Sequence, residues 1–280
     1  MTEHTFFFRT SDDTTLWVER RGEGRPLILL HGWHTSSRVW ERNINELARQ
    51  RDIITVDFRG HGRSQKTLTG HTPTRYARDV HELITALGLQ DVVLIGWGLG
   101  ATVALMYWQD FGREGRVTAL GLWDMTPFPY SDAGWNSHEL AGFQTQRATH
   151  LTDDMLTDRD TFLQHYFRRW WHHHHVPAGA ESLAEDLRAT PPWIALAIYS
   201  AYLLTNTSDI LPTVTVPTLL LATDNDIFPQ GLVQAKYLLS RLPRGTLHEL
   251  TGGHAFFYED PAACNELVLT FSRNQRGGFL

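Results

Sequence analysis

The stretch that decides the fold is VVLIGWGLGA, residues 92–101. A short apolar run, typical of a buried strand, is followed by a glycine-rich turn and then by helix-forming residues. In a nucleophile elbow the central position of such a turn carries a serine, held on a strained bend between strand and helix. That position here is Gly98, which has no side chain that could attack a substrate.

Three further motifs follow apolar strand patterns in the same chain. They are His31-Gly32-Trp33 after Leu27–Leu30, Arg59-Gly60-His61-Gly62-Arg63-Ser64 after residues 53–57, and Thr251-Gly252-Gly253-His254 after residues 247–250. Together with the turn at Gly98, their order and spacing resemble those of the α/β-hydrolase-fold superfamily over nearly the whole chain. The resemblance implies a mostly parallel, twisted sheet flanked by helices, with an inserted helical cap.

Length and composition set the outer bounds. A chain of 280 residues with 42% hydrophobic and 20% charged residues is ordinary for one large globular α/β domain. The net charge of −6 offers no basic footprint for nucleic acid, and no apolar run is long enough to cross a membrane. The single cysteine, Cys264, and the absence of a signal-peptide pattern favour a cytoplasmic location. The sequence does not indicate an oligomeric state.

The predicted elements divide the chain into a core and a cap. Strand and helix patterns alternate up to Gly121, beginning with a hairpin of Phe6–Phe8 and Leu16–Glu19. Residues 130–208 carry helical patterns only, with a break at Pro191-Pro192. We therefore expect a core of residues 1–129 and 209–280 and a helical cap of residues 130–208.

His254 is the best candidate for a general base, because a neutral imidazole near pH 7 accepts and returns protons efficiently. A histidine base needs a carboxylate to fix its tautomer, and two residues compete for that role. Asp124 ends the strand that follows the elbow helix, whereas Asp226 follows a later strand, with a spacing to Pro229 one residue shorter than is usual. We favour Asp124 and keep Asp226 as the alternative.

The backbone N–H groups of Trp33 and Leu99 would form an oxyanion hole, which a glycine at position 98 leaves in place. The inventory is thus a base, an acid and an anion-stabilising pocket without a nucleophile. Such a set suits proton abstraction from a substrate and not the formation of an acyl-enzyme.

The aromatic content predicts a pocket for a flat, apolar ligand. The chain has ten tryptophans and fourteen phenylalanines, and many of these aromatic residues lie between positions 123 and 202. Candidate pocket residues are His34, Trp97, Trp170 and Trp193. The run His172–His175 lies in a helix-like stretch that would point its imidazoles in different directions, so no metal site is predicted.

One branch of the superfamily fits this inventory: the cofactor-free dioxygenases that cleave 3-hydroxy-4-quinolones. They are similar in the placement of the acid and in the Gly32-Trp33 pair. The resemblance implies that His254 and Asp124 deprotonate the hydroxyl of a small aromatic or heterocyclic substrate, whose anion reacts with dioxygen without any cofactor. Gly98 departs from that pattern.

A second resemblance is to esterases and cofactor-free haloperoxidases, which carry G-W-S-x-G at the elbow. It implies a hydrolase lineage whose serine is replaced by Gly98, in nature or by design. A binding protein without turnover and a lyase are further alternatives. Oxygen uptake, ester cleavage restored by Gly98→Ser, and ligand binding without product distinguish the first three hypotheses.

Overall fold

One sheet of eight strands runs through the protein, in the order β1-β2-β4-β3-β5-β6-β7-β8. The computed structural model describes residues 3–274. The antiparallel strands β1 and β2 lie at one edge, and the pairs from β3 and β4 to β8 are parallel. The strands are β1 (Glu3–Arg9), β2 (Thr15–Arg21), β3 (Pro26–Leu30), β4 (Asp52–Val56), β5 (Val92–Trp97), β6 (Val117–Trp123), β7 (Thr218–Ala222) and β8 (Gly245–Glu249). The predicted mostly parallel α/β fold is confirmed.

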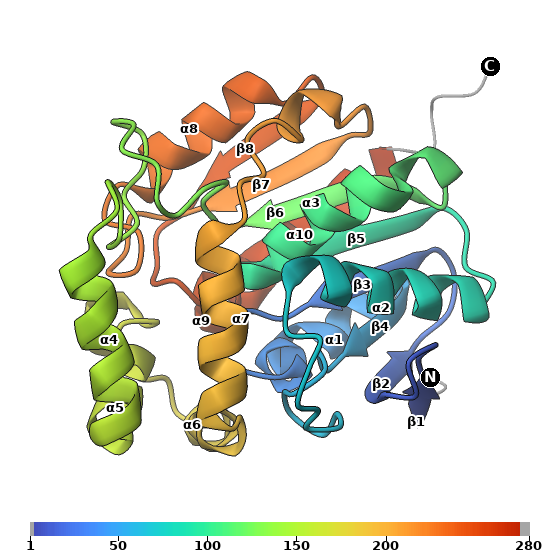
Figure 1. Cartoon of the computed structure of the whole chain (residues 1–280). Coiled ribbons are helices and arrows are strands. Elements are labelled where there is room, and N and C mark those ends of the chain that lie inside the picture. The colour runs from blue at the N-terminus through green and yellow to red at the C-terminus, as the bar shows by residue number, and fades with distance from the viewer. Residues whose placement is uncertain (1–2, 275–280) are drawn as a thin grey trace.

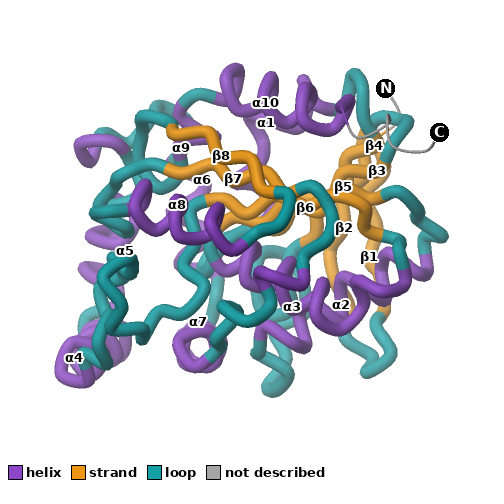
Figure 2. Tube along the Cα trace, turned by 90° about the horizontal axis from the view of Figure 1, so that it is seen from above, coloured by secondary structure: helices purple, strands orange, loops and turns teal. Residues whose placement is uncertain are grey.

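Helices cover both faces of this sheet (Figure 1, Figure 2). Helices α1, α9 and α10 pack together, as do α2 and α3. The α-helices are α1 (Glu41–Leu47), α2 (Pro73–Ala86), α3 (Leu99–Phe111), α4 (Thr145–Thr157), α5 (Arg159–Arg168), α6 (Glu181–Ala189), α7 (Pro192–Leu204), α8 (Gly231–Arg241), α9 (Phe256–Glu259) and α10 (Pro261–Asn274). Over residues 3–274, no helix combines the length and apolar character needed to span a bilayer.

Strand β3 shows why the central strands are apolar throughout. Leu27 and Leu29 lie in the hydrophobic core on one face of the sheet, whereas Ile28 and Leu30 lie in the core on the other. Successive side chains of a strand point to opposite faces, so a strand covered on both sides has no polar alternation. The edge hairpin differs, because β1 is largely exposed. The predicted hairpin is present, with Phe6 opposite Val18.

Between β6 and β7 the chain forms helices α4–α7 and no strand. Figure 1 shows these helices at one end of the sheet, with α4 beside α5 and α7 in front of the strand ends. The predicted break at Pro191-Pro192 falls between α6 and α7. The division into core and cap remains our proposal, and residues 1–2 and 275–280 of the predicted core lie outside the described residues.

The histidine run does not continue a helix, contrary to the sequence expectation. Residues His172–His174 form one short 3-10 turn, and His173 and His174 have φ values of 51° and 59°. Helix α5 has already ended at Arg168, and Trp171 is extended, so this left-handed backbone lies beyond the helix. One member of the run, His174, instead reaches the loop after β7.

Candidate active site

The turn at Gly98 joins β5 to α3, with φ 54° and ψ −117°. Its flanking glycines are required by packing, because a Cβ atom on Gly96 would lie 2.1 Å from the Gly100 carbonyl oxygen, and one on Gly100 would lie 2.4 Å from that of Leu30. A Cβ atom on Gly98 would instead meet only His254, at 3.6 Å from Nε2. The turn therefore has the geometry of a nucleophile elbow and room for a side chain at its centre.

His254 and Asp124 form a buried pair. His254 Nδ1 lies 2.5 Å from Asp124 Oδ2, and the two residues are 5% and 3% exposed. A carboxylate only accepts hydrogen bonds, so Nδ1 donates, and the lone pair of His254 lies on Nε2, toward Gly98. Asp124 directly follows β6, where its backbone N–H donates to the Leu221 carbonyl oxygen at 3.0 Å.

Asn225 is a second partner of the carboxylate that the sequence reasoning missed. Its Nδ2 donates to Asp124 Oδ2 at 2.8 Å and to Thr223 Oγ1 at 2.8 Å. Its Oδ1 accepts the backbone N–H groups of Ile227 and Phe228. Asn225 lies four residues before Pro229, one residue farther than Asp226. The spacing that argued against Asp226 was therefore the sequence signal that could have identified Asn225.

Asp226 is not the partner of His254, and the alternative assignment is wrong for this structure. Its carboxylate lies 2.5 Å from His174 Nε2, at the surface, where its side chain is 48% exposed. The neighbouring residue Asn225 points its side chain toward Asp124 instead. This pair links the turn after α5 to the loop after β7.

The two predicted backbone donors line the same cavity as Gly98 and His254. Among the described residues, the backbone N–H groups of Trp33 and Leu99 have no hydrogen-bond acceptor. Trp33 is fixed by its indole N–H, which donates to the Ala195 carbonyl oxygen at 3.0 Å, and by stacking on Tyr199. Both N–H groups are thus free to bind an oxyanion.

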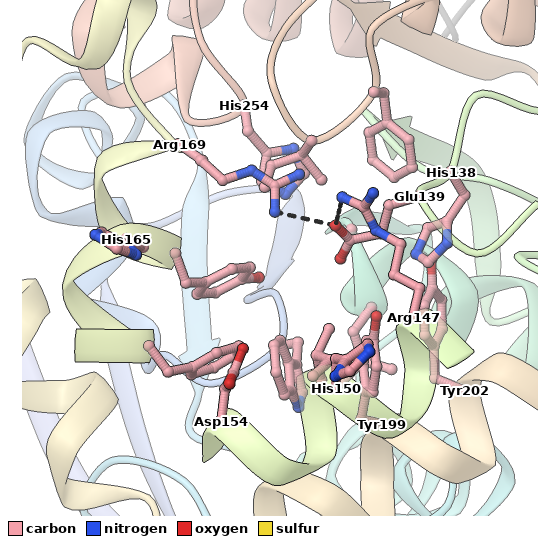
Figure 3. A pocket seen from close by; sticks show the side chains of 18 of the residues that line it. His138, Glu139, Arg147, His150, Asp154, His165, Arg169, Tyr199, Tyr202 and His254 are labelled. Carbon is pink, nitrogen blue, oxygen red and sulfur yellow. Dashed lines mark hydrogen bonds and ion pairs between the residues drawn. The ribbon is translucent and has the colours of Figure 1, made fainter. Parts of the chain in front are cut away.

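The cavity measures about 490 Å³. Its inner part is aromatic and contains Trp33, Trp97, Phe228 and Tyr199. Its outer part carries ionisable side chains from α4, α5 and the preceding loop, which Figure 3 shows around the cavity. The labelled residues of that part are Glu139, Arg147, His150, Asp154, His165 and Arg169. A cavity of this size accommodates a small organic molecule.

Three predicted pocket residues do not line this cavity, whereas the fourth, Trp97, does. His34 is fully buried, and Trp33 lies edge-on against it. Trp170 is fully buried and packs edge-on against Trp97, at 5.2 Å between ring centroids. Trp193 is 56% exposed on α7. Clustering in the sequence did not determine which side of the cap each indole faces.

An ion-pair triad crosses the outer cavity. Glu139 Oε2 lies 3.1 Å from both Arg147 and Arg169 (Figure 3). Burial raises the pKa of Glu139, but Arg169, His138 and Arg147 outweigh this effect and hold the pKa below its ordinary value. The carboxylate is therefore charged at neutral pH. No group of three metal-binding side chains occurs within residues 3–274.

Comparisons with known proteins agree with this fold. Residues 27–267 match the model of the alpha/beta hydrolase family, and the chain belongs to that family. A Synechocystis protein named "Putative non-heme chloroperoxidase" is 26% identical over 91% of this chain and 94% of its own. An esterase from Exiguobacterium antarcticum superposes with a TM-score of 0.88 at 24% identity, covering 96% of this chain and all of the esterase. A Bacillus anthracis bromoperoxidase gives a TM-score of 0.87 at 21% identity, over 96% and 100%.

The family match and the Synechocystis relative support the hydrolase lineage more than the dioxygenase interpretation, which neither of their names supports. The dioxygenase interpretation remains a prediction. The esterase and haloperoxidase resemblance is the one that the comparisons support.

Proposed function

We propose that this protein hydrolyses small aromatic esters or lactones without a covalent intermediate. The observation that carries the proposal is the position of His254 Nε2, 3.6 Å from where a Cβ atom on Gly98 would lie. A water molecule taking the position of a serine hydroxyl would face an imidazole whose other nitrogen is bonded to Asp124. General-base activation of water needs no side chain at position 98.

In the proposed reaction, His254 takes a proton from water, and the resulting hydroxide adds to the carbonyl carbon of the substrate. The N–H groups of Trp33 and Leu99 bind the oxyanion of the tetrahedral intermediate. When the intermediate collapses, the carbon–oxygen bond to the leaving alcohol breaks and His254 returns the proton to that oxygen. The products are a carboxylic acid and an alcohol, and Asp124 stabilises the imidazolium meanwhile.

The test is hydrolysis of an aryl ester and lactone panel by the wild-type protein, followed by quenched-flow kinetics and mass spectrometry. We expect turnover without a pre-steady-state burst and without an acyl adduct, and a loss of roughly a hundredfold or more in His254→Ala. Activity that persists in His254→Ala would contradict the proposal. If the panel stays intact while a 3-hydroxy-4-quinolone causes His254-dependent oxygen uptake, the dioxygenase interpretation replaces it.

A further inference from the structure

A second histidine, His138, lines the cavity and takes no part in the proposed reaction. It lies in the loop between β6 and α4 and is only 8% exposed. Asn136 builds this loop: its Nδ2 donates to the carbonyl oxygens of Phe128, Pro129 and Ser131, and its Oδ1 accepts the His138 backbone N–H. The position of the His138 ring is therefore set by a loop with its own hydrogen-bond network.

Local hydrogen bonding fixes the tautomer of His138. The backbone N–H of Leu140 lies 3.1 Å from His138 Nδ1, and a backbone N–H can only donate. Nδ1 therefore accepts, and the proton of the neutral ring is on Nε2. Burial lowers the pKa of His138 to about 4; Glu139 opposes this shift, whereas Arg169 and Arg147 add to it. The ring is neutral at pH 7 and has one donor, Nε2–H.

The two histidines of the cavity thus have opposite hydrogen-bonding capacities. His254 binds a carboxylate through Nδ1 and has an accepting Nε2, whereas His138 binds a backbone N–H through Nδ1 and has a donating Nε2. Both rings contact Phe228, at 5.7 Å and 6.0 Å between ring centroids. Figure 3 shows both histidines among the side chains around the same cavity.

No residue within 3–274 accepts a hydrogen bond from His138 Nε2, although the rest of the ring is held in place. Tyr202 and Phe228 are its aromatic neighbours, with ring centroids 6.1 Å and 6.0 Å from that of His138. We propose that His138 Nε2–H donates a hydrogen bond to a second oxygen of the substrate. The substrate class is then an aromatic ester or lactone that carries a further carbonyl oxygen. This inference rests on the proposed function.

Matched probe pairs test the inference by binding alone. Phenacyl acetate and 2-phenylethyl acetate differ in one ketone oxygen close to the ester, and 4-acetylphenyl acetate and 4-ethylphenyl acetate differ in one farther away. Dissociation constants are measured by calorimetry on His254→Ala, which prevents turnover. We expect one ketone to bind roughly tenfold more tightly than its partner, which is the effect of one hydrogen bond.

Two substitutions of His138 separate a donor from a loop residue. In His138→Gln the side-chain amide reaches the position of Nε2 and keeps a donor there. In His138→Asn the side-chain oxygen takes the place of Nδ1 and keeps the bond from Leu140. We expect His138→Gln to retain the preference for the ketone and His138→Asn to lose it, with both variants folded by circular dichroism.

The opposite pattern, with the preference retained only in His138→Asn, would overturn the inference, as would equal affinities within both pairs or no binding of either ketone. A ring that titrates near pH 6.5 or carries its proton on Nδ1, measured by long-range proton–nitrogen correlation, would also overturn it. Failure of the proposed function is a separate result: the wild-type protein would leave all four esters intact, whatever their order of affinity.

Discussion

The two walls of the cavity are built differently. On the wall formed by the sheet, Gly98 directly follows β5 and Asp124 directly follows β6. His254 lies in the loop after β8. On the wall formed by residues 130–208, His138 and Glu139 come from an irregular loop, and most of the other residues come from the helices that follow it. The first wall holds groups that can move a proton, and the second holds groups that can bind and select.

This difference separates groups held at the ends of strands from groups held on a loop and on surface helices. The candidate backbone donors, base and acid lie in segments that directly follow strands, and they come together although the central residue is glycine. The opposite wall is not built on strand ends, and we propose that its side chains select the substrate. We propose that the function depends on both walls, and the predictions below test this comparison.

The largest effect is expected for Gly98→Ser, which acts on the wall formed by the sheet. The new hydroxyl would lie beside His254 Nε2, because a Cβ atom at position 98 is only 3.6 Å from that nitrogen. The variant should hydrolyse p-nitrophenyl acetate about a thousandfold faster than the wild-type protein and show an acyl-enzyme burst in stopped-flow measurements. The strained φ of 54° is one that a serine adopts in an elbow.

Gly98→Ala is the matched control, because it adds the same Cβ atom without a hydroxyl. It should give no burst and no increase in rate. If Gly98→Ser and Gly98→Ala behave alike, the turn does not act as a nucleophile elbow. The wall formed by the sheet would then lack the chemistry that the comparison assigns to it.

Asp124→Asn should lower the rate of hydrolysis by between about a hundredfold and a thousandfold, because an amide stabilises neither the tautomer nor the charged form of His254. Asp226→Asn serves as the control, since that carboxylate faces His174 at the surface. We expect its rate to stay within about twofold of the wild-type rate. A larger loss in Asp226→Asn than in Asp124→Asn, measured as kcat/KM on the same ester, would reverse the assignment of the acid.

These predictions also show which parts of the site could be found from the sequence. The motifs around His31, Gly98 and His254 each follow a strand, so their residues meet at the same edge of a parallel sheet, and the resemblance of their order and spacing to the α/β-hydrolase fold placed them. The choice of Asp124 over Asp226 rested on the spacing to Pro229 and on the resemblance to subfamilies that place the acid after the strand following the elbow helix. The fold and the residues that it brings together on this wall were therefore predictable.

The other wall was not predictable for a physical reason. Whether a residue between positions 130 and 208 faces the cavity depends on how these helices pack on the sheet. The sequence pattern of one helix does not determine that packing. Trp170 and Trp193 are both indoles between positions 130 and 208, yet one is fully buried and the other is 56% exposed, and neither reaches the cavity. His138 could not be found either, because its tautomer depends on one backbone N–H.

Trp97 and Trp193 extend this contrast to stability. Trp97 is fully buried, donates its indole N–H to the His254 carbonyl oxygen and packs on the His254 ring. Trp97→Ala should lower the free energy of unfolding by about 3 kcal/mol, whereas Trp193→Ala should change it by no more than about 0.5 kcal/mol. Urea unfolding followed by circular dichroism measures both. Equal effects would mean that Trp193 is covered in solution.

The smallest effect concerns acid stability. Burial lowers the pKa of His34 to about 3 and that of His138 to about 4, both from an ordinary value of 6.5. Below pH 6.5 the unfolded chain binds a proton at each of these residues while the folded chain does not, so the free energy of unfolding falls as the pH falls toward those values. Each histidine should contribute a loss of about 1 kcal/mol between pH 6 and pH 5. His34→Gln and His138→Gln should each reduce this loss, in urea unfolding at the two pH values.

If His138→Gln leaves the pH dependence unchanged while His34→Gln reduces it, His138 is solvated in the folded protein. It would then not be the buried, neutral donor that the proposed substrate selection by this wall requires.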